Sequence, residues 1–357
     1  MTIKLIRRSA VGAAFGAGML LAAGLAAADT ISPMSYTNDD LAVGESVTIQ
    51  KTVVIEASGA TDALIDAFFL IDTTGSMGDE VEAAKIAAAD LLTGLRSFGD
   101  LSSGVGVFGE RALLSDAIRS DLNTNDSITT TAIAAQVNLG DPDGGFDFPE
   151  SSNTAIDLVA NNASFRPGSN RFIFVLGDAS AKGTPDADVI ASLAAKNVNL
   201  VGINFGGSAF ADDITDLGGT VFSSGADADE IVAAVTAGIS AGFAEYNSVT
   251  VGDLGGGGVI GVSAVCTGAD IGTCSGAEAM GDFDRATDRT FTFDVTFTRN
   301  AAGASTFPTY ALVDGGIVAR ETDSFGDTTA PVIPLPAAGW LMLGGFGALA
   351  AFRRRKP

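Results

Sequence analysis

Short apolar runs alternate with Ala-rich stretches of helical spacing over residues 58–246. The apolar runs cover 67–71, 105–108, 171–176, 199–205 and 220–223, and the helical stretches cover 78–95, 151–161, 186–196 and 227–246. Strands that are apolar throughout are typical of a sheet buried on both faces. The pattern therefore predicts an α/β domain of Rossmann-like type, with a mostly parallel sheet and helices on both faces.

The regions on either side show the alternation of half-buried strands instead. Residues 47–55 alternate apolar and polar side chains, and residues 289–299 do the same with Phe and Val on the apolar face. No helical spacing occurs in 247–330, which predicts an antiparallel β-sandwich. The strands within 29–57 are too few to fold alone. We therefore expect one split sandwich, 29–57 with 247–330, with the α/β domain of 58–246 inserted in it.

The N-terminal segment has the composition of a secretory signal peptide. Lys4, Arg7 and Arg8 precede an apolar stretch at 11–25, and three alanines end at Ala28. This order of basic, apolar and small residues predicts export and cleavage after Ala28. A retained N-terminal membrane anchor is the alternative, and the shortness of the apolar stretch speaks against it.

The C-terminal segment, 331–357, combines a proline-rich motif, an apolar run and a basic end. The motif contains Pro334, Leu335 and Pro336, the apolar run covers 337–352, and three arginines and a lysine follow. The simpler interpretation is a C-terminal transmembrane anchor with a cytoplasmic basic end. The sequence IPLPA at 333–337 also resembles the VPLPA variety of PEP-CTERM sorting tails. That resemblance implies an exosortase-type processing enzyme as a partner and passage from the inner membrane to the bacterial cell surface or extracellular matrix.

Charge and composition narrow the classes of function. Of the 20 Lys and Arg residues, three lie in the signal peptide and four in the tail, which leaves 13 against 43 Asp and Glu. The resulting formal net charge of −30 repels nucleic acid and attracts divalent cations. The chain has no His, which excludes Ser-His-Asp catalysis and most zinc sites.

The two cysteines, Cys266 and Cys274, are close together in a Gly-rich part of the sandwich sequence. In an exported chain this spacing predicts a disulfide. No His or basic neighbour would lower the pKa of either thiol, so a nucleophilic role has little support.

Oxygen-bearing side chains follow the expected strands of the α/β domain. Asp72, Thr74 and Ser76 come after the first strand, Asp178 follows the strand at 171–176, and an acidic Gly-rich loop precedes the helix at 151. That loop holds Asp141, Asp143, Asp147 and Glu150. Ligands of open parallel sheets bind beyond the carboxyl ends of the strands. Carboxylates and hydroxyls without His or thiolate suit a hard cation, Mg²⁺, Mn²⁺ or Ca²⁺.

Each part of this set has a structural alternative. Asp72 could form an Asx-turn, Ser76 could cap a helix, and the acidic loop could be solvated. The combination of all three segments at one expected sheet edge favours a metal site over these alternatives.

These segments resemble the von Willebrand factor A domain and its metal-ion-dependent adhesion site (MIDAS). DTTGSMGDE at 72–80, GVGVFGE at 104–110 and PDGGFD at 142–147 are most similar to the I-like domain of integrin β subunits, which is itself inserted in a β-sandwich. The resemblance implies a Mg²⁺ or Mn²⁺ site whose ligands are Asp72, Thr74, Ser76, Asp143 and Asp178. GGFDFPE also resembles bacterial A domains, so Asp147 competes with Asp143 for direct ligation.

The resemblance further implies a second, adjacent Ca²⁺ site at Asp79 and Glu80. It suggests a binding or adhesion protein at the cell surface, in which the cation captures an acidic group on a protein or polysaccharide partner. Displacement of the helix at 227–246 could couple ligand binding to domain orientation. A structural envelope or biofilm-matrix protein, in which the metal only stabilises the fold, is the alternative. An enzyme is not expected, because no general base, P-loop or nucleophile motif is present.

Overall fold

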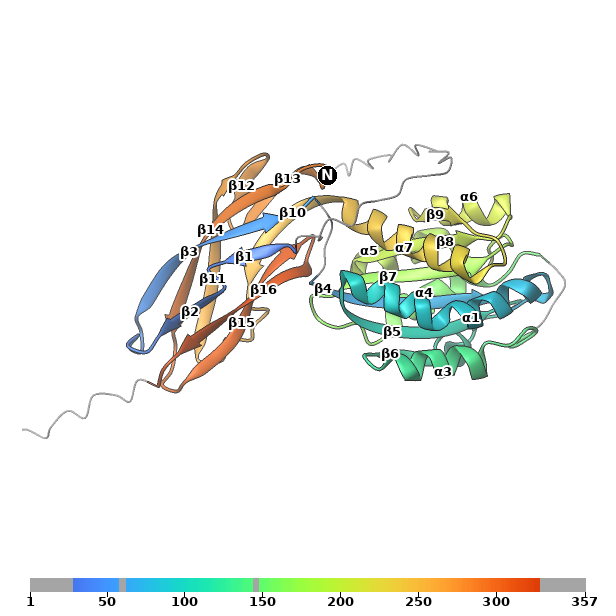
Figure 1. Cartoon of the computed structure of the whole chain (residues 1–357), viewed down its shortest axis with the longest axis horizontal. Coiled ribbons are helices and arrows are strands. Elements are labelled where there is room, and N and C mark those ends of the chain that lie inside the picture. The colour runs from blue at the N-terminus through green and yellow to red at the C-terminus, as the bar shows by residue number, and fades with distance from the viewer. Residues whose placement is uncertain (1–27, 58–61, 144–147, 328–357) are drawn as a thin grey trace, which may run out of the picture.

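The computed structural model describes residues 28–57, 62–143 and 148–327 (Figure 1). The signal peptide up to residue 27, the tail residues Pro334, Leu335 and Pro336, and the loop residue Asp147 lie outside the described residues. Within the described ranges, no helix is long and apolar enough to cross a membrane.

The α/β domain is built on a six-stranded sheet with the order β6-β5-β4-β7-β8-β9. Its strands are β4 (Ala63–Asp72), β5 (Gly99–Phe108), β6 (Ser120–Asn123), β7 (Asn170–Gly177), β8 (Val198–Asn204) and β9 (Thr220–Ser223). All neighbours pair in parallel except β6, which pairs antiparallel with β5 at the edge. The sheet is therefore mostly parallel, as the apolar runs predict.

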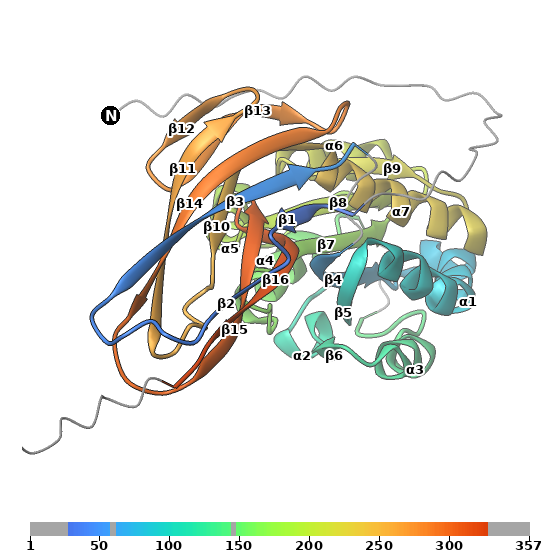
Figure 2. The ribbon, with the colours of Figure 1, turned by 60° about the vertical axis from the view of Figure 1, so that its left-hand side comes forward.

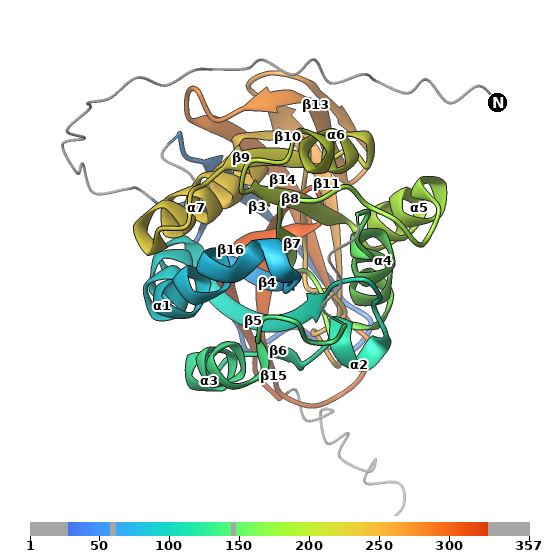
Figure 3. The same ribbon diagram turned by 90° about the vertical axis from the view of Figure 1, so that its right-hand side faces the viewer.

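Helices cover both faces of this sheet (Figure 3). One face packs against α1 (Gly78–Leu95), α3 (Asp126–Gln136) and α7 (Ala228–Ala244). The other packs against α2 (Leu114–Ala117), α4 (Ser152–Asn162), α5 (Asp186–Lys196) and α6 (Ser208–Asp216). Successive residues of β4 point to opposite faces, so Phe69 belongs to the first core and Phe68 to the second. The predicted fold class is confirmed.

The remaining strands form two packed sheets (Figure 2). The first has the order β1-β3-β14-β11, and the second β12-β13-β10-β15-β16-β2. The first sheet consists of β1 (Thr30–Ser32), β3 (Ser46–Ile55), β14 (Arg289–Arg299) and β11 (Ile260–Ala269). The second consists of β12 (Thr273–Ser275), β13 (Glu278–Asp284), β10 (Glu245–Gly252), β15 (Ser305–Val313), β16 (Gly316–Phe325) and β2 (Ser35–Asn38).

The α/β domain is inserted between two strands of this sandwich. The chain leaves the first sheet at the end of β3 and enters the second sheet at β10, after α7. Strand β3 pairs with β14 over ten residue pairs, from Ser46 with Thr298 to Ile55 with Arg289. The alternating side chains of both strands, including Val53, Phe291 and Phe293, fill one apolar core with those of the second sheet.

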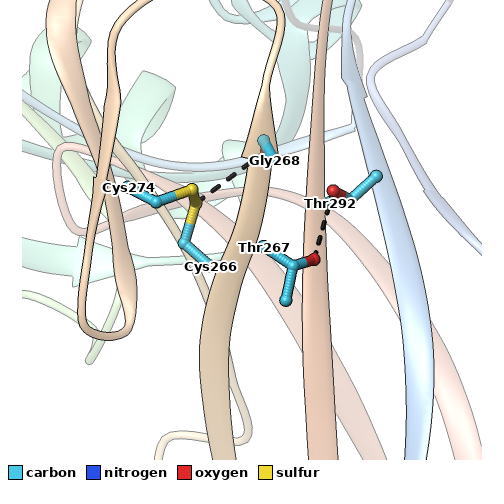
Figure 4. The surroundings of a disulfide bond; sticks show 5 residues. All are labelled: Cys266, Thr267, Gly268, Cys274 and Thr292. Carbon is cyan, nitrogen blue, oxygen red and sulfur yellow. Dashed lines mark hydrogen bonds between the residues drawn. A yellow bond between two sulfur atoms is a disulfide. The ribbon is translucent and has the colours of Figure 1, made fainter.

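A disulfide links the two sheets of the sandwich at one edge. Cys266 lies on β11 of the first sheet and Cys274 on β12 of the second, with their Cα atoms 5.3 Å apart (Figure 4). Ala28, the last residue of the expected signal peptide, is the first residue that the structure describes. The next residue, Asp29, is buried and forms an ion pair with Arg285 at 2.7 Å.

Several element boundaries differ from the sequence prediction. The helix predicted at 227–246 ends at Ala244, because Tyr246 is buried in the sandwich against Phe283, with ring centroids 5.0 Å apart. Strand β4 begins four residues before the predicted apolar run. The reason is Asp66, a buried acid whose Oδ1 accepts a hydrogen bond from Arg166 Nε at 2.6 Å. A paired buried charge interrupts an apolar pattern without interrupting the strand.

The sandwich contacts the amino ends of the parallel strands. Asn170 at the start of β7 donates hydrogen bonds to the carbonyl oxygens of Leu64 and Ile317, at 3.0 and 2.9 Å. Ile317 lies on β16 and also donates its N–H to Gly168. The carboxyl ends of the parallel strands therefore point away from the sandwich, as Figure 1 shows.

Candidate functional site

The strand order creates a topological switch point between β4 and β7. From β4 the chain continues to β5 on one side, and from β7 it continues to β8 on the other side. Asp72 is the last residue of β4, and Asp178 directly follows Gly177 at the end of β7. Ligand-binding crevices of open α/β sheets lie at such points. The topology thus brings both predicted aspartates to one edge.

Asp72 organises the turn after β4. Its Oδ1 atom accepts hydrogen bonds from the N–H of Thr74 at 2.9 Å and from Thr74 Oγ1 at 2.7 Å. This is the Asx-turn that the sequence offers as a structural alternative. Asp72 is only 1% exposed, and its second oxygen, Oδ2, has no hydrogen-bond partner among the described residues. Buried polar atoms are nearly always paired. The turn therefore accounts for one oxygen of Asp72 and leaves the other for a ligand.

Ser76 and Asp178 complete the core of the site. Ser76 Oγ donates a hydrogen bond to Asp178 Oδ1 at 3.1 Å, which joins the loop after β4 to the loop after β7. Ser76 lies in a short 3₁₀ turn, Gly75–Met77, that leads into α1. Its side chain is exposed while that of Thr74 is buried, so the group opens to solvent on the Ser76 side.

Glu150 is a further acid at this site. The sequence places it among the candidates of the acidic loop, but the ligand set implied by the family resemblance does not include it. It is 1% exposed, and its backbone is fixed by hydrogen bonds to Ser180 and Lys182 on the loop after β7. Burial raises the pKa of Glu150 to about 7, and the negative charges of Asp72, Glu110 and Asp178 add to this. The sequence feature that could have pointed to Glu150 as a residue of the site is its position at the end of the GGFDFPE segment.

Burial also raises the pKa of Asp72, to about 6. The hydrogen bonds from Thr74 oppose this rise, and the charge of Asp178 adds to it. Lys182 is a nearby cation, and its Nζ forms an ion pair with Glu110 at 2.6 Å. Asp72 and Glu150 are thus two acids whose ionised forms are disfavoured by burial and by neighbouring negative charge.

The structure places Asp143 at the rim of this group. Its carboxylate is exposed and lies 3.5 Å from Arg111 Nε, while its main-chain carbonyl lies close to Gly109 and accepts a hydrogen bond from the N–H of Glu110 at 3.4 Å. The side chain is therefore paired with a cation and is not directed into the group around Asp72. The choice between Asp143 and Asp147 as direct ligand stays a prediction, because Asp147 lies outside the described residues.

Asp79 and Glu80 lie in the first turn of α1. Acids at this position interact favourably with the helix dipole, which is sufficient reason for their presence. In the part of the chain that the structure describes, no three His, Cys, Asp or Glu side chains are grouped closely enough to form a metal site by themselves. The second site at Asp79 and Glu80 stays a prediction.

The residues present fit a hard divalent cation. Asp72 Oδ2 and Glu150 Oε2 are buried oxygens without a hydrogen-bond partner in the described ranges. Two hydroxyls and the carboxylate of Asp178 lie in the same group. Oxygen ligands of this kind are those that Mg²⁺, Mn²⁺ and Ca²⁺ prefer.

No family model and no curated protein matches the sequence. Among solved structures, the chain is similar to a von Willebrand factor type A protein from Catenulispora acidiphila, with 14% identity over 81% of this chain and 72% of that chain, at a TM-score of 0.41. It is similar to BatB from Bacteroides thetaiotaomicron, with 14% identity over 50% and 98%, at a TM-score of 0.40. It is also similar to the pilus adhesin SpaC from Lactobacillus rhamnosus GG, with 10% identity over 79% and 45%, at a TM-score of 0.36. Identities this low concern the fold alone.

Proposed function

We propose that this chain is an exported binding or adhesion protein that uses a divalent cation of the MIDAS type to bind an acidic group on its partner. The observation that carries the proposal is the buried Oδ2 of Asp72, which has no hydrogen-bond partner in the described ranges, beside the Ser76–Asp178 hydrogen bond. The sequence resemblance to von Willebrand factor A domains, closest to integrin β subunits, supports the same assignment.

In this proposal Mg²⁺ or Mn²⁺ is held by Asp72, Thr74, Ser76 and Asp178. Asp143 or Asp147 is the further ligand from the acidic loop, and Glu150 is a nearby acid. Hydroxyl ligands carry no charge, so a bound cation would keep an excess of positive charge and an affinity for a carboxylate. The Asx-turn fixes the position of Asp72, and Ser76 on the solvent side leaves access for a partner. A second cation, Ca²⁺, at Asp79 and Glu80 is part of the proposal.

The position of the site suits a surface protein. It lies at the end of the α/β domain away from the sandwich, and the chain continues from β16 of the sandwich into the C-terminal tail. With the tail as anchor or sorting signal, the site would face outward from the cell surface. The partner would be a protein or polysaccharide that offers a carboxylate, and exosortase-type processing belongs to the same proposal.

The test is a cation-dependent pull-down from the native cell surface with the full chain and with Asp72→Ala. We expect retention of partners in Mg²⁺ or Mn²⁺, loss in EDTA, and loss with Asp72→Ala. Asp282→Ala is the matched control, because Asp282 is an exposed acid on β13 of the sandwich. Retention that persists in EDTA would contradict the cation bridge.

Calorimetric titration with Mg²⁺ or Mn²⁺ separates this function from its alternative. If the protein is a matrix component whose metal only stabilises the fold, Asp72→Ala abolishes metal binding and metal-dependent stability while the pull-down is unchanged. If Asp72→Ala binds the cation as tightly as the wild type, the site is not the one described here. The proposal assigns no catalytic activity.

A further inference from the structure

Three ionisable side chains meet in the interior of the sandwich, far from the candidate cation site. Lys51 projects from β3 of the first sheet, and Glu321 and Asp323 project from β16 of the second sheet. The side chains of all three are fully buried, with 0% exposure. The proposed binding function uses none of them.

Their contacts are unusual for an ion pair. Lys51 Nζ lies 3.1 Å from Asp323 Oδ1, to which it donates a hydrogen bond. The same Nζ is in direct contact with Glu321 Oε1. Yet neither carboxylate oxygen of Glu321 has a hydrogen-bond partner within the described part of the chain. The amine thus meets Glu321 closely without the geometry of a hydrogen bond.

The surroundings are apolar. Lys51 Nζ lies 5.1 Å from the centroid of the Phe297 ring, and Phe297 packs against Phe307 and Phe325. Thr309 Oγ1 donates a hydrogen bond to Asp323 Oδ2 at 2.5 Å. Asp323 therefore has two donors, Lys51 and Thr309, while Glu321 has none among the described residues. The two acids therefore have different hydrogen-bonding surroundings in the same part of the core.

Keeping these three groups ionised is costly. One ammonium cannot neutralise two carboxylates, and a buried carboxylate that accepts no hydrogen bond is only partly compensated for its lost solvation by the contact with that ammonium. An amide between Lys51 and Glu321 would remove two of the three charges. Its N–H would remain a donor to Asp323, which Thr309 already holds.

We propose that Lys51 and Glu321 are joined by an intramolecular isopeptide bond between Nζ and Cδ. The unprotonated amine attacks Cδ of the neutral carboxyl group, and the Nζ–Cδ bond forms. Asp323 accepts a proton from the amine and returns it to the leaving hydroxyl, the Cδ–O bond breaks, and one water molecule leaves. No electron is gained or lost, and no further reactant is needed.

Two physical effects favour this step. Burial lowers the pKa of Lys51, which the interaction with Asp323 partly offsets, so the amine form is more accessible than in water. Holding amine and carboxyl in contact replaces a bimolecular encounter by an intramolecular one, which corresponds to effective molarities of about 10⁵–10⁸ M in well-oriented systems. Asp323 touches the reacting amine, and Thr309 is a positioning residue that orients Asp323.

The bond would connect the two sheets and the two halves of the split domain. Lys51 precedes the inserted α/β domain, and Glu321 lies on the last described strand. The cross-link therefore closes a loop, 52–320, that contains the whole insertion. It lies in the core, whereas the Cys266–Cys274 disulfide joins the sheets at their edge.

The test is the intact mass of the reduced, denatured full chain, followed by tryptic mapping. We expect the wild type to be lighter than its sequence by one water molecule. Trypsin should fail to cut after Lys51, and the peptide that begins at Glu321 should be found joined to the peptide that contains Lys51. Lys51→Arg and Asp323→Asn should both have the full sequence mass.

Lys85→Arg is the matched control, because Lys85 forms an ion pair of 2.9 Å with the exposed Glu82, outside the core of the sandwich. The mass deficit of this variant should equal that of the wild type. The wild-type measurement is decisive even if a core variant does not fold. A wild type with the full mass and normal cleavage after Lys51 would overturn the proposal. Fragments that place the link on Asp323 would overturn Glu321 as the acceptor.

Discussion

The buried carboxyl of Asp72 should make the metal-free protein less stable as the pH rises. Its pKa is raised from 3.8 to about 6 in the folded state. The folded state therefore binds this proton more tightly than the unfolded state, so stability falls as the pH rises from about 4 to about 6. The difference between these two pKa values corresponds to a loss in the free energy of unfolding on the order of 3 kcal/mol at neutral pH.

Asp72→Asn removes this charge and keeps a side-chain oxygen that can accept the hydrogen bonds from Thr74. In EDTA at pH 7.5, we expect the variant to be as stable as the wild type or more stable, by up to about 3 kcal/mol. Mg²⁺ at 100 times its dissociation constant should add about 2.7 kcal/mol to the wild type and nothing to the variant. Mg²⁺ should therefore shift the stability difference between the two proteins by about 2.7 kcal/mol in favour of the wild type.

Urea unfolding followed by far-UV circular dichroism provides the measurement, at pH 4.5, 6 and 7.5. The helical signal reports the α/β domain, because every described helix belongs to it. In the variant, the free energy of unfolding should still fall as the pH rises, but less than in the wild type, because Glu150 also has a raised pKa. The reasoning is refuted if Asp72→Asn destabilises the protein in EDTA at pH 7.5 and leaves the slope between pH 4 and 6 unchanged.

Three further changes test the packing. Phe174→Ala should lower the free energy of unfolding by about 3–5 kcal/mol, because Phe174 is fully buried between the sheet and α7, and urea titration checks this. Gly106→Ala should cost about 1–3 kcal/mol, because the added Cβ would collide with the carbonyl oxygen of Ala117; a smaller cost would mean that α2 can move. Cys266→Ser should lower the free energy of unfolding by about 2–3 kcal/mol, because the disulfide with Cys274 no longer closes the loop between them. The thermal midpoint of the variant should lie below that of the oxidised wild type and should equal that of the reduced wild type.

The elements that the sequence predicts best are those in which every residue follows one burial pattern. Helix α1 has the predicted bounds, 78–95, because its apolar residues recur at helical spacing between the sheet and solvent. Strand β14 likewise has the predicted bounds, 289–299, because one of its faces is buried and the other is not. Predictions failed where tertiary partners changed the pattern, as at Asp66 in β4 and Tyr246 in β10.

The same distinction between local patterns and tertiary partners applies to the candidate site. The sequence by itself determined which oxygen-bearing residues follow which strands, because strand ends are a local property. The shared edge of Asp72 and Asp178 was predicted from the strand pattern. Only the tertiary structure decided that Ser76 donates a hydrogen bond to Asp178, that Glu150 is buried, and that the carboxylate of Asp143 pairs with Arg111. It also brought Lys51 against Glu321, across the whole insertion. Burial and charge proximity depend on residues far apart in the chain, and a linear pattern does not contain those distances.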